Sequence, residues 1–208
     1  MKTIAVTGGI GSGKSEVCSI LSSRGIPVYD SDSAAKRLYR EDDSLLDSVE
    51  GAFGQSFRTT NGDPDLKKLA SVVFSSPEKL KTLESLVHPA VKEDFRRWKA
   101  MCTSKLEELP ASPDFYGGLP FCSMESAIIL EKPEFLAMVD SVVLVDAPLQ
   151  ARLNRACARD NVDPSEIIRR MAAQRFDLSK ADAVIRNHGT LEDLSAEVAR
   201  AFQALNSR

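Results

Sequence analysis

The chain has 208 residues, of which 43% are hydrophobic, so it can bury a sizeable core and suits one domain with insertions better than two independent domains. Its net charge of -3 gives no broad basic surface, and we therefore expect no nucleic acid or anionic membrane as a partner. The cysteines are scattered without a C-x-x-C pair, and we recognise no signal peptide or membrane span. These features favour a cytoplasmic protein with reduced thiols and no zinc site.

The most informative segment lies near the N-terminus, where a predicted strand over residues 3–7 runs into a glycine-rich stretch. Residues 8–15 read Gly-Gly-Ile-Gly-Ser-Gly-Lys-Ser and fit the pattern G-x-x-x-x-G-K-[ST] without a mismatch. Such a loop turns backbone N–H groups toward phosphate oxygens, while Lys14 reaches the β- and γ-phosphates and the Ser15 hydroxyl binds Mg²⁺. The pattern predicts a purine nucleoside triphosphate site. The residues expected to bind the nucleotide are Gly9, Ile10, Gly11, Ser12, Gly13, Lys14, Ser15 and Glu16.

Two other interpretations of this stretch are weaker. An ordinary Gly/Ser-rich turn would not need a strand before it and a helix after it. The dinucleotide fingerprint G-x-G-x-x-G, started at Gly9, would require glycine where Lys14 stands, which disfavours a nicotinamide or flavin site.

The remaining elements of the core alternate between helix and strand. Apolar spacing predicts a helix after the loop that ends at Gly25, and a second strand over Ile26–Asp30. Further strands are predicted over Phe121–Ser126, Val139–Asp146 and Ala183–Ile185. Strands separated by helices indicate an α/β fold with a parallel sheet, helices on both faces and ligands at the carboxyl ends of the strands.

Between the second and third strands, residues 33–115 show helical periodicity and little strand character, which predicts a helical insertion. Its apolar stripe comprises Leu80, Leu83, Leu86 and Val87 and is expected to pack in a helical core. Pro89 is expected to start a new helical segment that ends near Leu109, before a loop over 110–120.

An acidic pair closes the second strand. Alternation along a strand would send Asp30 and Asp32 to the same side, at the ligand edge of the sheet. Phosphoryl transfer to a hydroxyl needs a proton acceptor beside the phosphate loop, and Asp32 is the candidate base. The alternative is that Asp32 caps a helix beginning at Ser33, and both roles can hold if Asp30 supplies the carboxylate.

Arginines accumulate later in the chain without any lysine among them. They are Arg152, Arg155, Arg159, Arg169, Arg170 and Arg175. The first three share one face of a predicted helix, whose packing face would hold Leu149, Leu153 and Ala156. A second helix is expected to start at Asp163-Pro164-Ser165-Glu166, with a cap and a capping box. Guanidinium groups bind phosphate bidentately, so we interpret this hairpin as a closing lid; the alternative is a solvated charged face.

Together these segments resemble the dephospho-CoA kinase family over nearly the whole chain. The resemblance is carried by the phosphate loop, Asp30-Ser31-Asp32, the segment Leu83–Pro89, the lid entry Gln150–Leu153 with Arg155 and Arg159-Asp160, Gln174, and Ala181–Asn187. It implies a P-loop kinase fold that phosphorylates the ribose 3′-hydroxyl of dephospho-CoA from ATP with Mg²⁺. The implied parts are a nucleotide-binding core (1–32, 116–148 and 180–208), a CoA-binding insertion (33–115) and a lid (149–179).

The resemblance also implies roles for particular residues. Asp32, Lys14, Arg152 and Arg155 would be catalytic, Asn187 would bind the nucleotide, and Asp30, Asp32 and His88 would bind the acceptor. The chain departs from the family pattern at Glu16, Lys36-Arg37, Leu66 and Ala127-Ile128-Ile129. No oligomeric state is implied.

Other functions remain as alternatives. A P-loop kinase for another small acceptor, such as a nucleoside monophosphate, would share the loop and the lid. A GTP-dependent switch is disfavoured, because Asp114-Phe115-Tyr116-Gly117 follows a proline-rich loop and the sequence contains no Asn-Lys-x-Asp signature. A nucleotide-binding protein without catalysis would not need the acidic pair and the arginine-rich lid.

Overall fold

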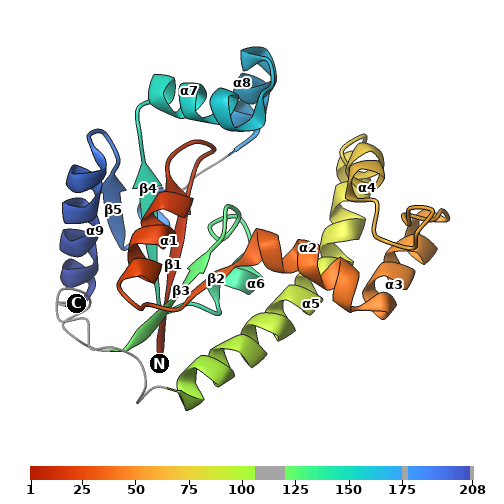
Figure 1. The fold of residues 1–208 in the computed structure, drawn as a ribbon, viewed down its shortest axis with the longest axis horizontal. Coiled ribbons are helices and arrows are strands. Elements are labelled where there is room, and N and C mark those ends of the chain that lie inside the picture. The colour runs from red at the N-terminus through yellow and green to blue at the C-terminus, as the bar shows by residue number, and fades with distance from the viewer. Residues whose placement is uncertain (106–119, 175–177, 207–208) are drawn as a thin grey trace. The chain divides into compact units, whose positions relative to one another are not determined.

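The chain divides into two compact units in the computed structural model, which describes residues 1–105, 120–174 and 178–206 (Figure 1). Unit 1 comprises Met1–Tyr29 and Met101–Arg208, and unit 2 comprises Asp30–Ala100. Three sequence predictions fall on residues outside the described ranges: most of the loop over 110–120, the segment Asp114–Gly117, and the helix end near Leu109. Arg175 also lies outside them.

A five-stranded sheet forms the centre of unit 1, in the order β2-β3-β1-β4-β5. The strands are β1 (Lys2–Gly8), β2 (Val28–Asp30), β3 (Phe121–Glu125), β4 (Ser141–Asp146) and β5 (Ala183–Arg186). β1 pairs in parallel with β3 and β4, and β4 pairs in parallel with β5. The predicted α/β fold with a parallel sheet is therefore confirmed, although β2, β3 and β4 are one or two residues shorter than predicted and β5 is one residue longer.

Both faces of β1 are buried, as a strand at the centre of a parallel sheet requires. Ile4 and Val6 face the cluster made by α1 (Lys14–Ser23) and α9 (Leu191–Asn206), while Ala5 lies between them in the strand and is also fully buried. Phe121 of β3 stacks on Phe202 of α9 with ring centroids 5.4 Å apart. This packing fixes the position of the β1 end, from which the glycine-rich loop leaves the sheet.

Unit 2 is helical. It holds α2 (Ser31–Glu41), α3 (Asp43–Phe53), α4 (Leu66–Val73) and most of α5 (Pro77–Ser104). Asp94 of α5 is buried and accepts a hydrogen bond of 2.6 Å from Arg37 of α2, which joins the two helices. Asp side chains cap α2, α3 and α4, because a carboxylate accepts from the N–H groups that a helix start leaves unpaired.

The predicted break at Pro89 is wrong, because α5 continues through this proline. Val87, Val91 and Phe95 recur at helical spacing on both sides of Pro89 and are buried. Burial of this stripe outweighs the loss of one backbone hydrogen bond at the proline.

A helical hairpin follows β4 and is formed by α7 (Leu149–Asp160) and α8 (Pro164–Ala173) (Figure 1). Asp163 caps α8 by accepting from the Ser165 N–H at 2.8 Å, as predicted. Glu166 accepts a hydrogen bond from Arg170 one turn further on, so its carboxylate faces an arginine of its own helix. The predicted packing of Leu149 is wrong, since this residue at the helix start is 66% exposed, whereas Ala156 is buried.

The smaller elements are α6 (Pro133–Leu136) between β3 and β4, and a 3-10 turn over Leu178–Lys180 before β5. Among the residues described, no helix has both the length and the apolar character needed to cross a membrane.

Candidate functional site: the phosphate loop and its supports

The glycine-rich loop connects β1 to α1 and adopts backbone conformations that suit glycine. Gly13 is the N-cap of α1 with a φ of 98°, and Gly11 has a φ of 72°. Both values are left-handed, where an L-residue with a Cβ is strained. The loop therefore ends at the N-terminus of α1, where unpaired N–H groups and the helix dipole attract an anion.

Lys14 folds back over this loop. Its Nζ donates to the Gly8 carbonyl at 2.9 Å and to the Gly9 carbonyl at 3.4 Å. These contacts keep the ammonium group beside the loop, where an anionic phosphate oxygen would be a stronger acceptor than a carbonyl.

The Ser15 hydroxyl donates to the Glu125 carboxylate, with 2.8 Å between Oγ and Oε1. Glu125 ends β3 and lies in register with Val6 of β1, so the sheet brings it to the start of α1. Glu125 was not among the residues predicted at the site, because nothing local in the sequence indicates a contact across the sheet. A hydroxyl next to a carboxylate is an oxygen donor set of the kind that Mg²⁺ prefers, so the residues present fit this metal.

A metal at this point would need further ligands. Among the described residues, we find no cluster of three or more His, Cys, Asp or Glu side chains able to hold a metal ion. Mg²⁺ commonly keeps several waters and binds through one or two protein groups together with substrate phosphates. The Ser15–Glu125 pair is consistent with that mode of binding.

Asn187 supports the phosphate loop through a side-chain hydrogen bond to its backbone. It follows β5, is buried, and its Nδ2 donates to the Ser12 carbonyl at 2.8 Å. Its Oδ1 accepts a hydrogen bond of 3.5 Å from Arg155 of α7. The side-chain amide thus joins the phosphate loop to the α7–α8 hairpin, and the same residue also lines the cavity described below.

Arg152 and Gln174 hold the loop from the hairpin side. Arg152 Nε donates to the Ile10 carbonyl at 3.0 Å, and the Ile10 N–H donates to Gln174 Oε1 at 2.8 Å. A Cβ added at Gly9 would collide with the Arg152 guanidinium, so the glycine there makes room for an arginine. Gln174 entered the sequence analysis only through the family resemblance.

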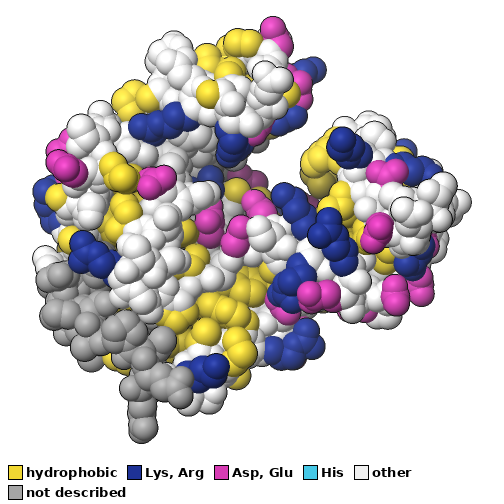
Figure 2. Space-filling view, viewed as in Figure 1, with side chains coloured by type: hydrophobic (Ala, Val, Ile, Leu, Met, Phe, Trp, Pro, Cys, Tyr) yellow, Lys and Arg dark blue, Asp and Glu magenta, His cyan; other side chains and the backbone are white. Residues whose placement is uncertain are grey.

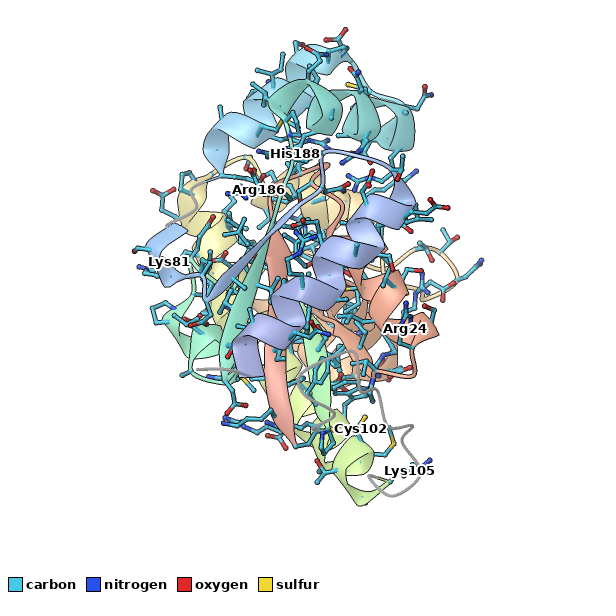
Figure 3. The ribbon with its side chains drawn as sticks, turned by 90° about the vertical axis from the view of Figure 1, so that its left-hand side faces the viewer. Arg24, Lys81, Cys102, Lys105, Arg186 and His188 are labelled. Atoms are coloured by element: carbon cyan, nitrogen blue, oxygen red, sulfur yellow. The ribbon has the colours of Figure 1, made fainter. Side chains whose placement is uncertain are left out.

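A cavity of about 440 Å³ opens beside the loop. It is lined by Gly11, Gly13, Lys14, Ser15, Glu16, Arg155, Arg159, Asn187, Gly189, Thr190, Leu191 and Leu194. Figure 3, viewed toward α9, shows His188 in the connection from β5 to α9, below the α7–α8 hairpin. The phosphate loop, two of the predicted arginines and the connection after β5 therefore converge on one space.

Arg159 is held at the cavity wall by an ion pair. Its Nε lies 2.7 Å from Asp160 Oδ1, and Arg170 of α8 lies 3.5 Å from the other carboxylate oxygen. The hydrogen bond from Arg159 lowers the pKa of Asp160, and that of Arg159 is raised in turn. The arginine remains charged, as an anion-binding wall requires.

The acidic pair lies in unit 2 and differs from the sequence expectation. Asp30, not Asp32, caps α2: its Oδ1 accepts from the N–H groups of Asp32 and Ser33 at 3.0 Å each, and its Oδ2 accepts from the Ser33 hydroxyl at 2.6 Å. Asp32 is an exposed residue of the first helical turn. The expected strand alternation is wrong, because the chain has already turned into a helix at Ser31. His88 is partly buried in the middle of α5.

A parallel α/β sheet whose first strand runs into such a loop defines a P-loop nucleotide-binding protein. Similar folds occur in the Campylobacter jejuni dephospho-CoA kinase (TM-score 0.60, 21% identity, 100% of this chain and 98% of that one) and in a Thermus thermophilus protein (TM-score 0.73, 33% identity, 99% and 96%). The family described as dephospho-CoA kinase matches residues 2–193, and the chain belongs to this family.

Two relatives extend this match. The dephospho-CoA kinase of Porphyromonas gingivalis is 39% identical over 183 residues, which cover 88% of this chain and 82% of the relative. That of Chlorobaculum tepidum is 34% identical over 209 residues, covering 97% and 94%. The family resemblance inferred from the motifs is therefore confirmed.

Proposed function

We propose that this protein is a dephospho-CoA kinase that transfers the γ-phosphoryl group of ATP to the ribose 3′-hydroxyl of dephospho-CoA, giving CoA and ADP. The observation that carries the proposal is the phosphate loop at the start of α1, with Lys14 and Ser15 beside a cavity lined by Arg155 and Arg159. The family match over residues 2–193 supports the choice of acceptor.

The loop residues from Gly9 to Glu16 would bind the phosphates of ATP through their N–H groups. Lys14 would exchange its contacts with the Gly8 and Gly9 carbonyls for phosphate oxygens. Ser15 would hold Mg²⁺, with Glu125 next to its hydroxyl, and the bound ion would neutralise charge on the phosphate oxygens.

Asp32 is the proposed base that accepts the proton of the attacking hydroxyl. Of the two carboxylates in the acidic pair, Asp30 already accepts three hydrogen bonds at the start of α2, which favours Asp32 as the base. Asp32 is an exposed residue of the first turn of α2, two residues after the end of β2. As the hydroxyl oxygen bonds to the γ-phosphorus, its proton passes to Asp32 and the bond to the ADP oxygen breaks.

The α7–α8 hairpin is proposed as the lid over the nucleotide. Arg155 and Arg159 line the cavity, while Arg152 is bound to the loop backbone. Figure 2 shows basic side chains, drawn in dark blue, on this hairpin, and its sequence makes all of them arginines. Charged guanidinium groups stabilise a transferring phosphoryl group, and a closed lid excludes the water that would otherwise hydrolyse ATP.

Unit 2 is proposed to bind the acceptor, which carries a diphosphate. Lys36 and Arg40 are exposed on α2, next to Arg37, whose guanidinium group is paired with Glu41 and Asp94, and Figure 2 shows basic side chains over this helix. A diphosphate prefers such cationic partners. His88, on α5 of the same unit, is the further proposed contact.

The deciding experiment measures ADP release from Mg-ATP with dephospho-CoA, AMP, CMP or no acceptor at matched concentrations. We expect turnover with dephospho-CoA alone, loss of turnover when EDTA removes Mg²⁺, and loss in Lys14→Ala. Turnover with a monophosphate would reassign the acceptor, and slow hydrolysis that no acceptor accelerates would contradict the proposed kinase reaction.

A further inference from the structure

Two side chains of the α7–α8 hairpin hold opposite ends of the same loop residue. Arg152, in the first turn of α7, donates to the Ile10 carbonyl at 3.0 Å. Gln174, the C-cap residue of α8, accepts from the Ile10 N–H at 2.8 Å. The hairpin is therefore attached to the phosphate loop at its beginning and at its end.

The contact at Ile10 determines which way the Gln174 amide faces. A backbone N–H can only donate, so the atom opposite it must be the carbonyl oxygen of the side chain. The carboxamide NH2 group then faces away from Ile10. A residue that could only accept at this position would reproduce the contact with the loop but would offer no donor of its own.

Both attachments bear on the arginines of the cavity. Arg155 and Arg159 lie on α7, between Arg152 and Gln174 in the chain, and their guanidinium groups line the space beside Lys14. The contacts of Arg152 with Ile10 and of Arg155 with Asn187 both hold α7, whereas Gln174 holds the end of α8, so its contact restrains the inclination of the hairpin at a point that the other two do not reach. Enzymes lose rate when charged groups shift by about 1 Å from the reacting centre.

We propose that Gln174 is a positioning residue: by accepting the Ile10 N–H, it fixes the α7–α8 hairpin on the phosphate loop and thereby sets the lid arginines over the nucleotide. No reacting atom is assigned to it. The consequence for catalysis rests on the proposed function, but the attachment itself does not.

The attachment is tested first by amide hydrogen exchange of the full-length enzyme without nucleotide. Ile10 is only partly buried, so protection of its N–H depends on the hydrogen bond. In Gln174→Met, which keeps the length but removes the acceptor, exchange at Ile10 should be faster by about tenfold. The Ser12 N–H, which donates to the Gly9 carbonyl at 3.0 Å, should keep its rate.

Two further variants test whether a change in Ile10 exchange is due to the loss of the Gln174 acceptor. Gln174→Glu retains an acceptor and should restore the protection of Ile10. Gln203→Met makes the same chemical change at an exposed position of α9 and should leave Ile10 exchange unaltered. Unchanged Ile10 exchange in Gln174→Met, or faster exchange in Gln174→Glu, would overturn the proposal.

Steady-state kinetics then test the consequence for the reaction. We expect Gln174→Met to lower kcat by about tenfold while the KM for ATP changes by less than about threefold, because the arginines act mainly on the transition state. ATP hydrolysis without acceptor should rise relative to transfer. An unchanged kcat alongside faster Ile10 exchange would overturn the catalytic part. Absence of dephospho-CoA turnover in the parent enzyme would instead contradict the proposed function, and the exchange experiment would still test the attachment.

Discussion

Asp30 and Asp32 lie two residues apart, yet the structure gives them different surroundings. Asp30 accepts hydrogen bonds from two backbone N–H groups and one hydroxyl, as a helix cap does. Asp32 belongs to the helix that Asp30 begins, and its carboxylate is exposed. The capping role of Asp30 and the proposed chemical role of Asp32 can therefore be separated by substitution.

We predict that substitution of Asp32 lowers the rate of the reaction, whereas substitution of Asp30 lowers the stability of the fold. Asp32→Asn should lower kcat by about a hundredfold, because the proposed base is lost, with little change in unfolding free energy. Asp30→Ala should cost about 1 kcal/mol of stability through loss of the cap. Urea unfolding and ADP release, measured on both variants, check the pair. An Asp32→Asn enzyme with the parent rate would remove Asp32 from the chemistry.

Asn187 offers a second test at the residue scale. Asn187→Ala removes the donor to the Ser12 carbonyl and should cost about 1–2 kcal/mol of stability, because a buried acceptor is left unpaired. Nucleotide affinity should fall as well, since the loop loses its support. Thermal unfolding with and without ATP measures both effects. The exposed neighbour His188 provides the control, and a similar loss in His188→Ala would refute the assignment to the Ser12 contact.

At the element scale, local sequence patterns were sufficient to predict those helices, strands and turns that depend on a single segment of the chain. The loop sequence specified a strand, a tight turn and a helix, and Gly11 and Gly13 have the positive φ values that such a turn requires. Contacts between distant segments were not predictable in this way. Glu125 meets Ser15 only because β3 lies beside β1, and Gln174 meets Ile10 only because the hairpin returns to the loop.

At Pro89 the prediction was wrong because it relied on the rule that proline ends a helix. A proline usually ends a helix, but here the buried stripe of Val87, Val91 and Phe95 continues across it. Similarly, the capping preference of aspartate was correctly recognised but assigned to Asp32 in place of Asp30.

This proline carries a prediction for α5. Pro89→Ala restores a backbone N–H within the helix and should raise the unfolding free energy by about 2 kcal/mol, because proline is the least favourable residue in a helix interior. The midpoint of urea unfolding, read by circular dichroism, measures this change. Ala90→Gly should lower stability by about 1 kcal/mol at the next position of the same helix. A less stable Pro89→Ala would indicate that the proline helps α5 pack.

On the scale of the whole molecule, acidic side chains that stabilise helix ends and ion pairs should govern the response to pH. Hydrogen bonds from Ser44 and the Leu45 N–H lower the pKa of Asp42, and the Arg159 hydrogen bond lowers that of Asp160. Glu50 is shifted in the same direction by Ser56 and the Phe57 N–H. Such groups bind fewer protons when folded than when unfolded at acid pH.

Stability should therefore be retained at neutral pH and fall as the pH drops below the ordinary values of 3.8 for Asp and 4.5 for Glu. The loss continues until the lowered pKa values of the folded protein are passed. Thermal unfolding between pH 7 and pH 3 measures it. Asp42→Asn should flatten part of the slope, since it removes one shifted group; a midpoint independent of pH would contradict the assignment.

The glycine at position 9 has a consequence for how this sequence can vary. Its φ is not left-handed, so backbone freedom does not require glycine there; the neighbouring Arg152 guanidinium occupies the space of a Cβ. Positions 9 and 152 are therefore coupled through volume. In a homologue with alanine at position 9, the arginine at position 152 should turn its guanidinium group aside or be replaced by a shorter side chain, so an alignment can test whether these two positions vary together although they lie far apart in the sequence.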